Sequence, residues 1–213
     1  MMISAFDVDK TLFKVNTSLH FGLHLYKKGI ISTVSLFELL LYYALFCLRL
    51  LSTSTLHKKA FERFFHGRSK KELEEAFEKF IENECDKIIY PPAMERLVQV
   101  KAEGHYIAFL SNSPDFIVRA IAAKLHADEW AGTLYQVDAS GLIEKVLQDL
   151  GGREKGEALA AMAKRQGVTL NECIAYSDSM QDLPFLESAG TAVVVNGERP
   201  LRKLARKNGW EML

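Results

Sequence analysis

The sequence predicts an α/β fold, in which a parallel sheet is flanked by helices and a helical segment is inserted after the first strand. Short apolar runs alternate with helix-like segments along most of the chain, as they do in proteins built on parallel sheets. One long helix-like stretch, residues 14–89, separates the first apolar run from the next. The 213 residues, 48% of them hydrophobic and 25% charged, suffice for one such domain carrying an insert.

Composition excludes some classes of protein. Lys and Arg number 27 and Asp and Glu number 27, so no overall positive field indicates a nucleic-acid partner. Cys47, Cys85 and Cys173 lie far apart and form no C-x-x-C pair, which favours free thiols in a reducing compartment. A strand begins almost at the first residue, so we expect no secretory signal and a cytoplasmic protein.

The expected elements follow from periodicity and from Gly and Pro positions. We expect strands at residues 3–8, 105–110, 133–137, 141–146, 172–176 and 192–195, and helices at 17–28, 93–103, 114–125, 155–166 and 199–208. Leu19, Leu23 and Tyr26 lie roughly on one face of the first helix. The division that follows is a core of residues 1–13 and 90–213 and a helical insert of residues 14–89.

The most apolar stretch, Ile30–Leu51, lies in the insert. From Leu39 to Leu48 only tyrosine hydroxyls are polar, and Glu38 and Arg49 bracket the run. A membrane-spanning helix needs about 18 or more apolar residues. A buried helix of the insert is the first interpretation, a helix lying on a membrane surface is the second, and a true span is the third.

Charge is distributed unevenly over the insert. Residues 14–71 contain ten Lys or Arg against two acids, whereas residues 72–86 contain seven acids against Lys79. The acidic block predicts the solvated face of a helix, with Leu73, Phe77 and Phe80 beneath it. The basic part is either solvated or faces an anionic substrate or anionic lipid.

The first predicted strand ends in two carboxylates, Asp7 and Asp9. Residues two apart in a strand point the same way, so both side chains can converge at the carboxyl end of the strand. Open α/β sheets bind ligands there. Two acids so close repel each other unless a cation or a proton lies between them. A polar turn without a function is the alternative.

Other predicted strands and helices add polar residues near the same edge. Ser111 ends the second strand, Lys155 begins a helix, and Asp178 and Asp182 follow a later strand. Each has a structural alternative: Ser111 and Ser113 as helix caps before Pro114, Lys155 as a surface lysine, Asp178 as an N-cap. Their order at successive exits favours one site.

These residue types suit phosphoryl transfer. Mg²⁺ prefers hard oxygen ligands, which Asp7, the main-chain carbonyl of Asp9 and Asp178 can supply. A phosphate needs donors, such as the Ser111 hydroxyl, backbone N–H groups and the Lys155 ammonium. One carboxylate can attack phosphorus to form an aspartyl-phosphate, and a second can protonate the leaving oxygen and then activate water.

The set Asp7-Val8-Asp9-Lys10-Thr11, Ser111, Lys155 and Ser177-Asp178-Ser179-Met180-Gln181-Asp182 resembles the four motifs of the haloacid dehalogenase superfamily. The insert after the first motif resembles its C1-capped, phosphoserine-phosphatase-like subfamily IB. The resemblance implies a Rossmann-like core, an all-helical cap and a Mg²⁺-dependent phosphatase acting on a small phosphorylated substrate.

The resemblance also implies a role for each matched residue. Asp7 would be the nucleophile and Asp9 the general acid and base, with Thr11 steadying the loop. Ser111, with Asn112 beside it, and Lys155 would bind the phosphoryl oxygens. Asp178 would bind the metal together with Asp7 and Asp9, and Asp182 would hold a metal-bound water or Lys155.

Three positions depart from the phosphoserine phosphatases. Lys10 stands where small residues are usual, and Ser177-Asp178-Ser179 replaces Gly-Asp-Gly. Asn16 replaces a Glu that holds the ammonium group of the substrate, so we expect a substrate other than phosphoserine. The last motif and the apolar insert are similar to the membrane-associated phosphatidylglycerophosphatase C branch, so a lipid phosphatase at the inner membrane surface is the alternative.

His20 and His24, four residues apart, could bind a metal, line the substrate pocket with Asn16, or occupy ordinary helix positions. A scaffold without activity is a further alternative, against which the full set of catalytic residue types argues. The sequence leaves the oligomeric state open.

Overall fold

The structure is a computed structural model that describes residues 1–48, 50, 51 and 53–213. The elements in chain order are β1 (Ile3–Phe6), the irregular turn η1 (Val8–Leu12), α1 (Thr17–Lys27), α2 (Thr33–Cys47), α3 (Thr53–Phe64), α4 (Lys70–Ile88), α5 (Pro91–Ala102), β2 (Tyr106–Pro114), α6 (Asp115–Lys124), β3 (Glu129–Val137), β4 (Ile143–Gln148), α7 (Gly152–Gln166), η2 (Leu170–Glu172), β5 (Cys173–Ser177), η3 (Met180–Asp182), α8 (Leu183–Ser188), β6 (Thr191–Val194), α9 (Arg199–Asn208) and β7 (Glu211–Met212).

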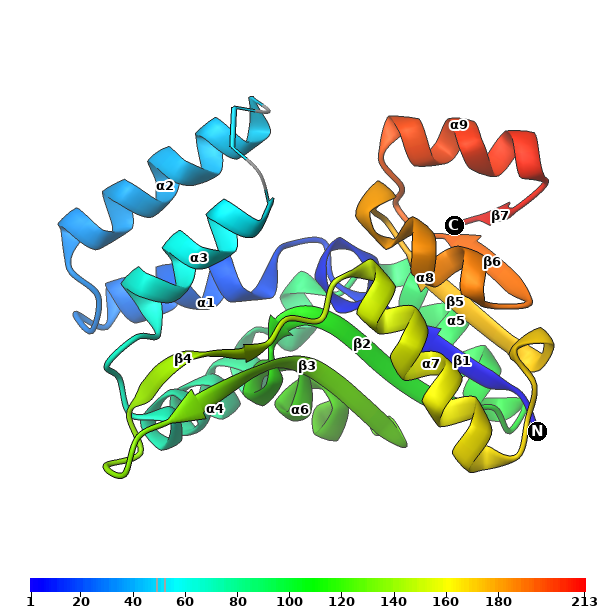
Figure 1. Ribbon diagram of the computed structural model, residues 1–213, viewed down its shortest axis with the longest axis horizontal. Coiled ribbons are helices and arrows are strands. Elements are labelled where there is room, and N and C mark those ends of the chain that lie inside the picture. The colour runs from blue at the N-terminus through cyan, green and yellow to red at the C-terminus, as the bar shows by residue number, and fades with distance from the viewer. Residues whose placement is uncertain (49, 52) are drawn as a thin grey trace.

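One sheet organises the molecule (Figure 1). Within the described residues it has seven strands in the order β4-β3-β2-β1-β5-β6-β7. Every neighbouring pair is parallel except β3 and β4, which form an antiparallel hairpin. The central strand β1 pairs with β2 on one side and β5 on the other. The predicted α/β fold with a mostly parallel sheet is therefore confirmed.

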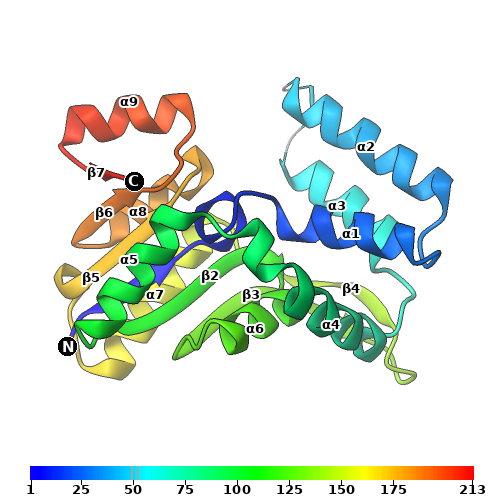
Figure 2. The same cartoon turned by 180° about the vertical axis from the view of Figure 1, so that it is seen from behind.

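Helices cover both faces of the sheet because the strand side chains alternate between two cores. Phe6 and Phe109 point into a core that α4, α5 and α6 complete. Ala5 and Leu110, one residue along their strands, point into the opposite core, which α7, α8 and α9 complete. The carboxyl ends of β1, β2 and β5 consequently open at one edge, between two layers of helices (Figures 1 and 2).

The helices α1–α4 leave and rejoin the sheet at one point. Tyr90 N donates to Leu12 O at 2.9 Å, and Lys14 N donates to Ile88 O at 2.7 Å, so the outgoing and returning chains lie side by side. A second tie joins the start of α4 to the β3–β4 hairpin, where Gly67 N donates to Ile143 O at 2.8 Å. The carboxyl ends of the central strands therefore lie between this helical segment and the β3–β4 hairpin.

Local sequence fixes where these helices begin. The Asn16 side chain accepts from Leu19 N and caps α1, and the Ser69 side chain accepts from Glu72 N and caps α4. Pro91 and Pro92 occupy the first turn of α5, where their missing N–H groups cost nothing. The predicted core of the acidic helix α4 is confirmed, since Leu73, Phe77 and Phe80 are buried.

Leu19, Leu23 and Tyr26 share one half-buried face of α1, and a second, fully buried face carries Phe21 and Leu25. One expectation for the helical segment is wrong. The apolar stretch 30–51 is not simply buried, because a large part of α2 faces outward. Arg49, expected to end that stretch, lies outside the described residues. In the part of the chain that is described, every helix is too short or too polar to cross a bilayer.

Candidate active site

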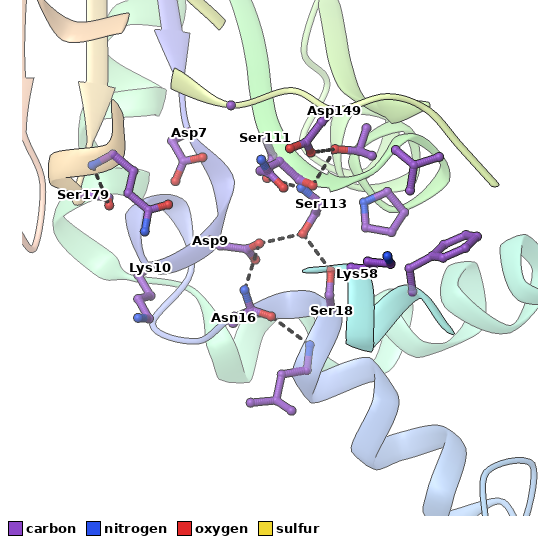
Figure 3. A pocket seen from close by; sticks show the side chains of 18 of the residues that line it. Asp7, Asp9, Lys10, Asn16, Ser18, Lys58, Ser111, Ser113, Asp149 and Ser179 are labelled. Atoms are coloured by element: carbon purple, nitrogen blue, oxygen red, sulfur yellow. Dashed lines mark hydrogen bonds between the residues drawn. The ribbon is translucent and has the colours of Figure 1, made fainter. Parts of the chain in front are cut away.

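The polar residues at the predicted strand exits come together in one cavity of about 810 Å³. Asp7 and Asp9 reach it from the end of β1, Ser111 from β2, Lys155 from the first turn of α7, and Asp178 from the end of β5. Figure 3 shows Asp7, Asp9, Ser111 and Ser113 around the same space. The structure thus brings together residues as far apart in sequence as Asp7 and Asp182.

A buried ion-pair network fixes Asp7. Lys155 Nζ donates to Asp7 Oδ1 at 2.6 Å and to Asp182 Oδ2 at 2.7 Å. Asp182 Oδ2 also accepts from Ser177 Oγ at 2.7 Å. Burial alone lowers the pKa of Lys155, but Asp182 and Asp7 together raise it above its ordinary value. Lys155 is therefore a fixed cation between two carboxylates.

The donor set fits a divalent cation. Thr11 Oγ1 lies 3.1 Å from Asp7 Oδ2 and 3.4 Å from Asp178 Oδ1, so both carboxylates meet at one hydroxyl. Burial raises the pKa of Asp7 to about 7, and burial together with Asp7 raises the pKa of Asp178 to about 8. The raised pKa values show that Lys155 does not fully offset the burial and mutual repulsion of these two carboxylates, which a bound cation would relieve. No cluster of three His, Cys, Asp or Glu side chains suited to a metal occurs among the described residues, so a carbonyl and waters would complete the shell.

Asp9 is held by neutral donors from two other elements. Its Oδ1 accepts from the backbone N–H and the hydroxyl of Thr17, each at 2.6 Å. Its Oδ2 accepts from Ser113 Oγ at 2.6 Å and from Asn16 Nδ2 at 3.3 Å. Asp9 therefore joins the end of β1 to the start of α1 and to the carboxyl end of β2 (Figure 3).

Two sequence expectations change here. Ser113 was expected to cap the next helix, but its hydroxyl bonds Asp9 and lies 2.7 Å from Ser18 Oγ, and Pro114 precedes α6 without a side-chain cap. Asn16 lines the cavity as expected, yet both ends of its amide are engaged, by Asp9 and by Leu19 N. The bonds of Ser113 to Asp9 and Ser18 could not be read from local sequence, since they join residues about a hundred positions apart.

Ser111 and Asn112 present hydrogen-bonding groups to the cavity. Ser111 Oγ accepts from Ser113 N at 3.2 Å, and its own proton remains for an acceptor such as a phosphoryl oxygen. Asn112 Oδ1 is buried and has no hydrogen-bond partner among the described residues. A buried polar atom in this state indicates a ligand or water at the site.

The other end of the cavity is aromatic, and sequence reasoning missed it. Phe61, Phe64 and Phe65 from α3 and its C-terminal end line it, together with Leu19 and Tyr135. The rings of Phe61 and Tyr135 stack at 5.4 Å with an interplanar angle of 6°, which joins α3 to β3. The run Phe61-Glu62-Arg63-Phe64-Phe65 was the available signal, but only the fold shows that its rings border the polar site.

His20 and His24 do not belong to this site. Their rings contact Phe80 of α4 at centroid distances of 5.7 and 5.1 Å, and neither residue lines the cavity. Burial and Lys28 lower the pKa of His24. Because α1 directs Phe21 and Leu25 inward, the two histidines lie on the side that faces α4, which favours the alternative that they occupy ordinary helix positions.

Comparisons with known proteins agree with this arrangement. The family model of haloacid dehalogenase-like hydrolases matches residues 5–187. A phosphoserine phosphatase of Mycobacterium tuberculosis, SerB1, is 33% identical over 218 residues, which cover 97% of this chain and 68% of that protein. The inhibition of morphological differentiation protein of Streptomyces azureus is 28% identical over 215 residues, which cover 98% and 76%.

Solved structures share the fold. A protein of unknown function from Bordetella pertussis aligns with a TM-score of 0.82 at 19% identity, covering 99% of this chain and 97% of that one. A phosphoserine phosphatase with a phospho-aspartyl intermediate analogue aligns with a TM-score of 0.69 at 21% identity, covering 99% and 91%. The chain therefore belongs to the haloacid dehalogenase-like hydrolases, as a phosphatase of that family.

Proposed function

We propose that this chain is a Mg²⁺-dependent phosphomonoester hydrolase that works through an aspartyl-phosphate. One observation carries the proposal: the Asp7 carboxylate, only 4% exposed, is fixed by Lys155 and Thr11 at the end of β1 and borders the cavity that also holds Asp9. A carboxylate that donors hold rigidly in a water-poor site is poised to attack phosphorus.

In the proposed reaction, an oxygen of Asp7 forms a bond to phosphorus while the bond from phosphorus to the alcohol oxygen breaks. Asp9 gives its proton to the leaving oxygen, and then takes a proton from the water that attacks the phospho-Asp7. This second step releases inorganic phosphate and restores both carboxyl groups. Ser111, Asn112 and Lys155 hold the phosphoryl oxygens throughout.

Asp7, Asp178 and the main-chain carbonyl of Asp9 would hold the Mg²⁺. The bound ion supplies positive charge that offsets the repulsion between the carboxylates and the phosphate. Burial raises the pKa of Asp178, and the charge of Lys10 opposes that rise. Lys10 therefore adds a second positive charge beside the proposed metal ligands. Asp182 keeps Lys155 in place through their 2.7 Å contact.

We further propose that residues 14–89 act as a cap that selects the substrate. Support comes from the cavity, which Asn16, Leu19 and Phe61 of this segment line together with residues of the sheet edge. A small phosphorylated metabolite is the proposed substrate. Phosphoserine is not favoured, because the neutral Asn16 amide is already engaged and offers no charge-assisted bond to an ammonium group.

The aromatic end of the cavity supports a second candidate, a lipid-phosphate phosphatase of the phosphatidylglycerophosphate type. Phe61, Phe64 and Tyr135 could contact an apolar part of a substrate whose phosphate lies at Asp7. Incubation of the purified protein with Mg²⁺ and a panel of metabolite and lipid phosphates, followed by trapping of an acid-stable, hydroxylamine-sensitive phosphoenzyme, tests both candidates. Absence of any turnover across the panel would refute them.

A further inference from the structure

Helix α2 carries a continuous apolar stripe on its outer side. Val34, Phe37 and Leu41 are 69%, 68% and 48% exposed, and Leu48, one residue beyond the helix, is 68% exposed. Leu48 N donates to Ala44 O at 3.0 Å, so the helical path continues to Leu48. At 100° per residue these four positions and the exposed Ala44 fall within an arc of about 80°.

The stripe is not the side by which α2 packs on its own chain. The packing side carries the buried Leu36, and Glu38 of α2 binds Arg63 of α3 at 2.6 Å. In both views of the molecule α2 is the outermost helix of its segment, with α1 and α3 beneath it (Figures 1 and 2). Single exposed apolar side chains are common, but a contiguous stripe of this kind indicates an interaction surface.

Charge around the stripe selects the kind of partner. Lys27 and Lys28, both exposed, precede α2, whereas the two acids of residues 14–71 are each paired, Glu38 with Arg63 and Glu62 with Lys59. The acidic helix α4 lies on the far side of α1 and α3 from α2 (Figure 1). The apolar stripe of α2 thus follows two exposed lysines in the chain, and the acidic helix α4 lies on the opposite side of the helical segment.

We propose that the stripe Val34, Phe37, Leu41, Ala44 and Leu48, flanked by Lys27 and Lys28, docks this chain on an anionic lipid surface. The 15 residues of α2 extend about 22 Å, which is less than the roughly 30 Å of a hydrocarbon core, so the helix lies along the interface. Apolar side chains enter the headgroup boundary while the lysines meet anionic headgroups. The docking does not depend on the proposed reaction.

The test measures partitioning of the full chain onto vesicles. Vesicles of phosphatidylcholine with phosphatidylglycerol are compared with vesicles of phosphatidylcholine alone, by co-sedimentation at low salt. We expect binding to the anionic vesicles that weakens as salt is added. Phe37→Glu and Leu41→Glu should each lower the partition coefficient about tenfold or more. Lys27→Gln and Lys28→Gln should each lower it about fivefold, on anionic vesicles alone.

Val98→Glu is the matched control, because Val98 is 60% exposed on α5, away from the stripe. It should change partitioning less than twofold, and thermal melting of each variant verifies the fold. Absence of vesicle binding by the wild type, or an equal loss in Val98→Glu, would overturn the proposal. So would a dimer in sedimentation velocity that Phe37→Glu dissociates without any vesicle binding, since the stripe would then contact a second copy.

Discussion

Asp7 and Asp9 lie two residues apart, yet their partners differ in charge. Asp7 contacts the Lys155 ammonium at 2.6 Å, whereas the hydrogen bonds of Asp9 come from neutral groups of Thr17, Ser113 and Asn16. Burial raises the pKa of Asp7 and Lys155 opposes that rise, while its ammonium also fixes the Asp7 oxygen proposed to attack phosphorus. The donors from Thr17, Ser113 and Asn16 fix the orientation of the Asp9 carboxyl group beside it. The fold thus holds both carboxyl groups in fixed positions for the two roles proposed for them.

Asp7→Asn should lower kcat by about a thousandfold or more, which corresponds to about 4 kcal/mol of barrier, because the amide cannot form the acyl-phosphate. Turnover of an aryl phosphate with Mg²⁺ gives the measurement. Asp86→Asn, a substitution on the exposed surface of α4, is the matched control and should leave kcat unchanged. A variant of Asp7 that keeps more than about a tenth of the wild-type rate contradicts the nucleophile assignment.

The raised pKa values of Asp7 and Asp178 predict the pH dependence of the metal-free protein. Their ordinary value is 3.8, and the folded values are about 7 and about 8. Between about pH 4 and 8 the folded form therefore binds more protons than the unfolded form, so the free energy of unfolding should fall as the pH rises. Mg²⁺ should stabilise the protein more at pH 8 than at pH 5, since it binds the ionised carboxylates.

The free energy of unfolding, measured with denaturant at pH 5 and pH 8 in the presence of Mg²⁺ or of a chelator, checks this pH dependence. Asp178→Asn removes a buried charge, so without metal this variant should be more stable than the wild type at pH 8 and should respond less to Mg²⁺. Turnover should cease with the chelator and return with Mg²⁺. A metal-free protein that is equally stable at both pH values, or full activity in excess chelator, speaks against the scheme.

At the scale of elements, the position of Lys155 depends on how closely α7 approaches η3. A Cβ on Gly152, the first residue of α7, would overlap the carbonyl oxygen of Gln181 and lie 2.9 Å from the Cα of Asp182. Both contacts are with backbone, which cannot move aside as a side chain can. Gly152 therefore permits the approach that brings Lys155 to Asp182.

Gly152→Ala should lower the free energy of unfolding by about 1–3 kcal/mol and reduce turnover, because the backbones must separate. Gly156→Ala on the same helix is the matched control. There the nearest atom is Ser188 Oγ at 3.3 Å, and the gain in helix propensity of about 1 kcal/mol offsets the mild crowding. Equal losses of stability in the two variants would show that the close approach of α7 and η3 is not the cause.

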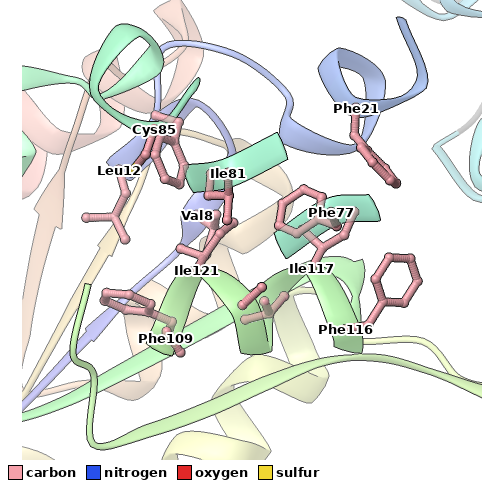
Figure 4. Close-up of a cluster of buried hydrophobic side chains, with 14 of the residues drawn as sticks. Val8, Leu12, Phe21, Phe77, Ile81, Cys85, Phe109, Phe116, Ile117 and Ile121 are labelled. Carbon is pink, nitrogen blue, oxygen red and sulfur yellow. The ribbon is translucent and has the colours of Figure 1, made fainter. Parts of the chain in front are cut away.

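The elements also show what sequence can and cannot predict. Strand exits were located because apolar runs end in Asp7, Ser111 and Asp178, where the periodicity stops. The apolar residues of α1 include Leu19, Leu23 and Tyr26 as well as Phe21, so the pattern alone does not show that Phe21 packs on Phe77 (Figure 4). Likewise, a helix as apolar as α2 carries no pattern that says which side is covered.

At the scale of the molecule, the cavity has a polar end on the sheet edge and an aromatic end on the helical segment, with a volume of about 810 Å³. No local pattern predicts this cavity, because its two ends come from segments that meet only in the folded chain. The volume exceeds the needs of a phosphate alone and lies in the range of sites for whole small molecules.

Substrate preference should follow from the polar end and the aromatic end of the cavity. Phosphoserine should be at least tenfold poorer in kcat/KM than the best non-amino phosphomonoester. For the lipid-phosphate candidate, linear alkyl phosphates should gain up to about fourfold in kcat/KM per methylene until the aromatic end is filled. Leu19→Asn should reduce the gain in kcat/KM per added methylene, while kcat/KM for the shortest alkyl phosphate should stay unchanged. Phosphoserine as the best substrate would rule out the role given to Asn16, and a flat alkyl series would rule out the lipid-phosphate candidate.

The place of β1 at the centre of the sheet has a consequence for synthesis on the ribosome. Ile3 is made before its partners on the two sides, Tyr106 and Cys173, which follow more than a hundred residues later. At about 5–20 residues per second the second partner follows on the order of ten seconds or more after the first strand. Until then β1 is an apolar strand with unpaired edges, the kind of segment that pairs with the wrong chain. Newly made chains should therefore depend on chaperones most strongly before Cys173 has left the ribosome, and a stalled chain ending ahead of it should aggregate.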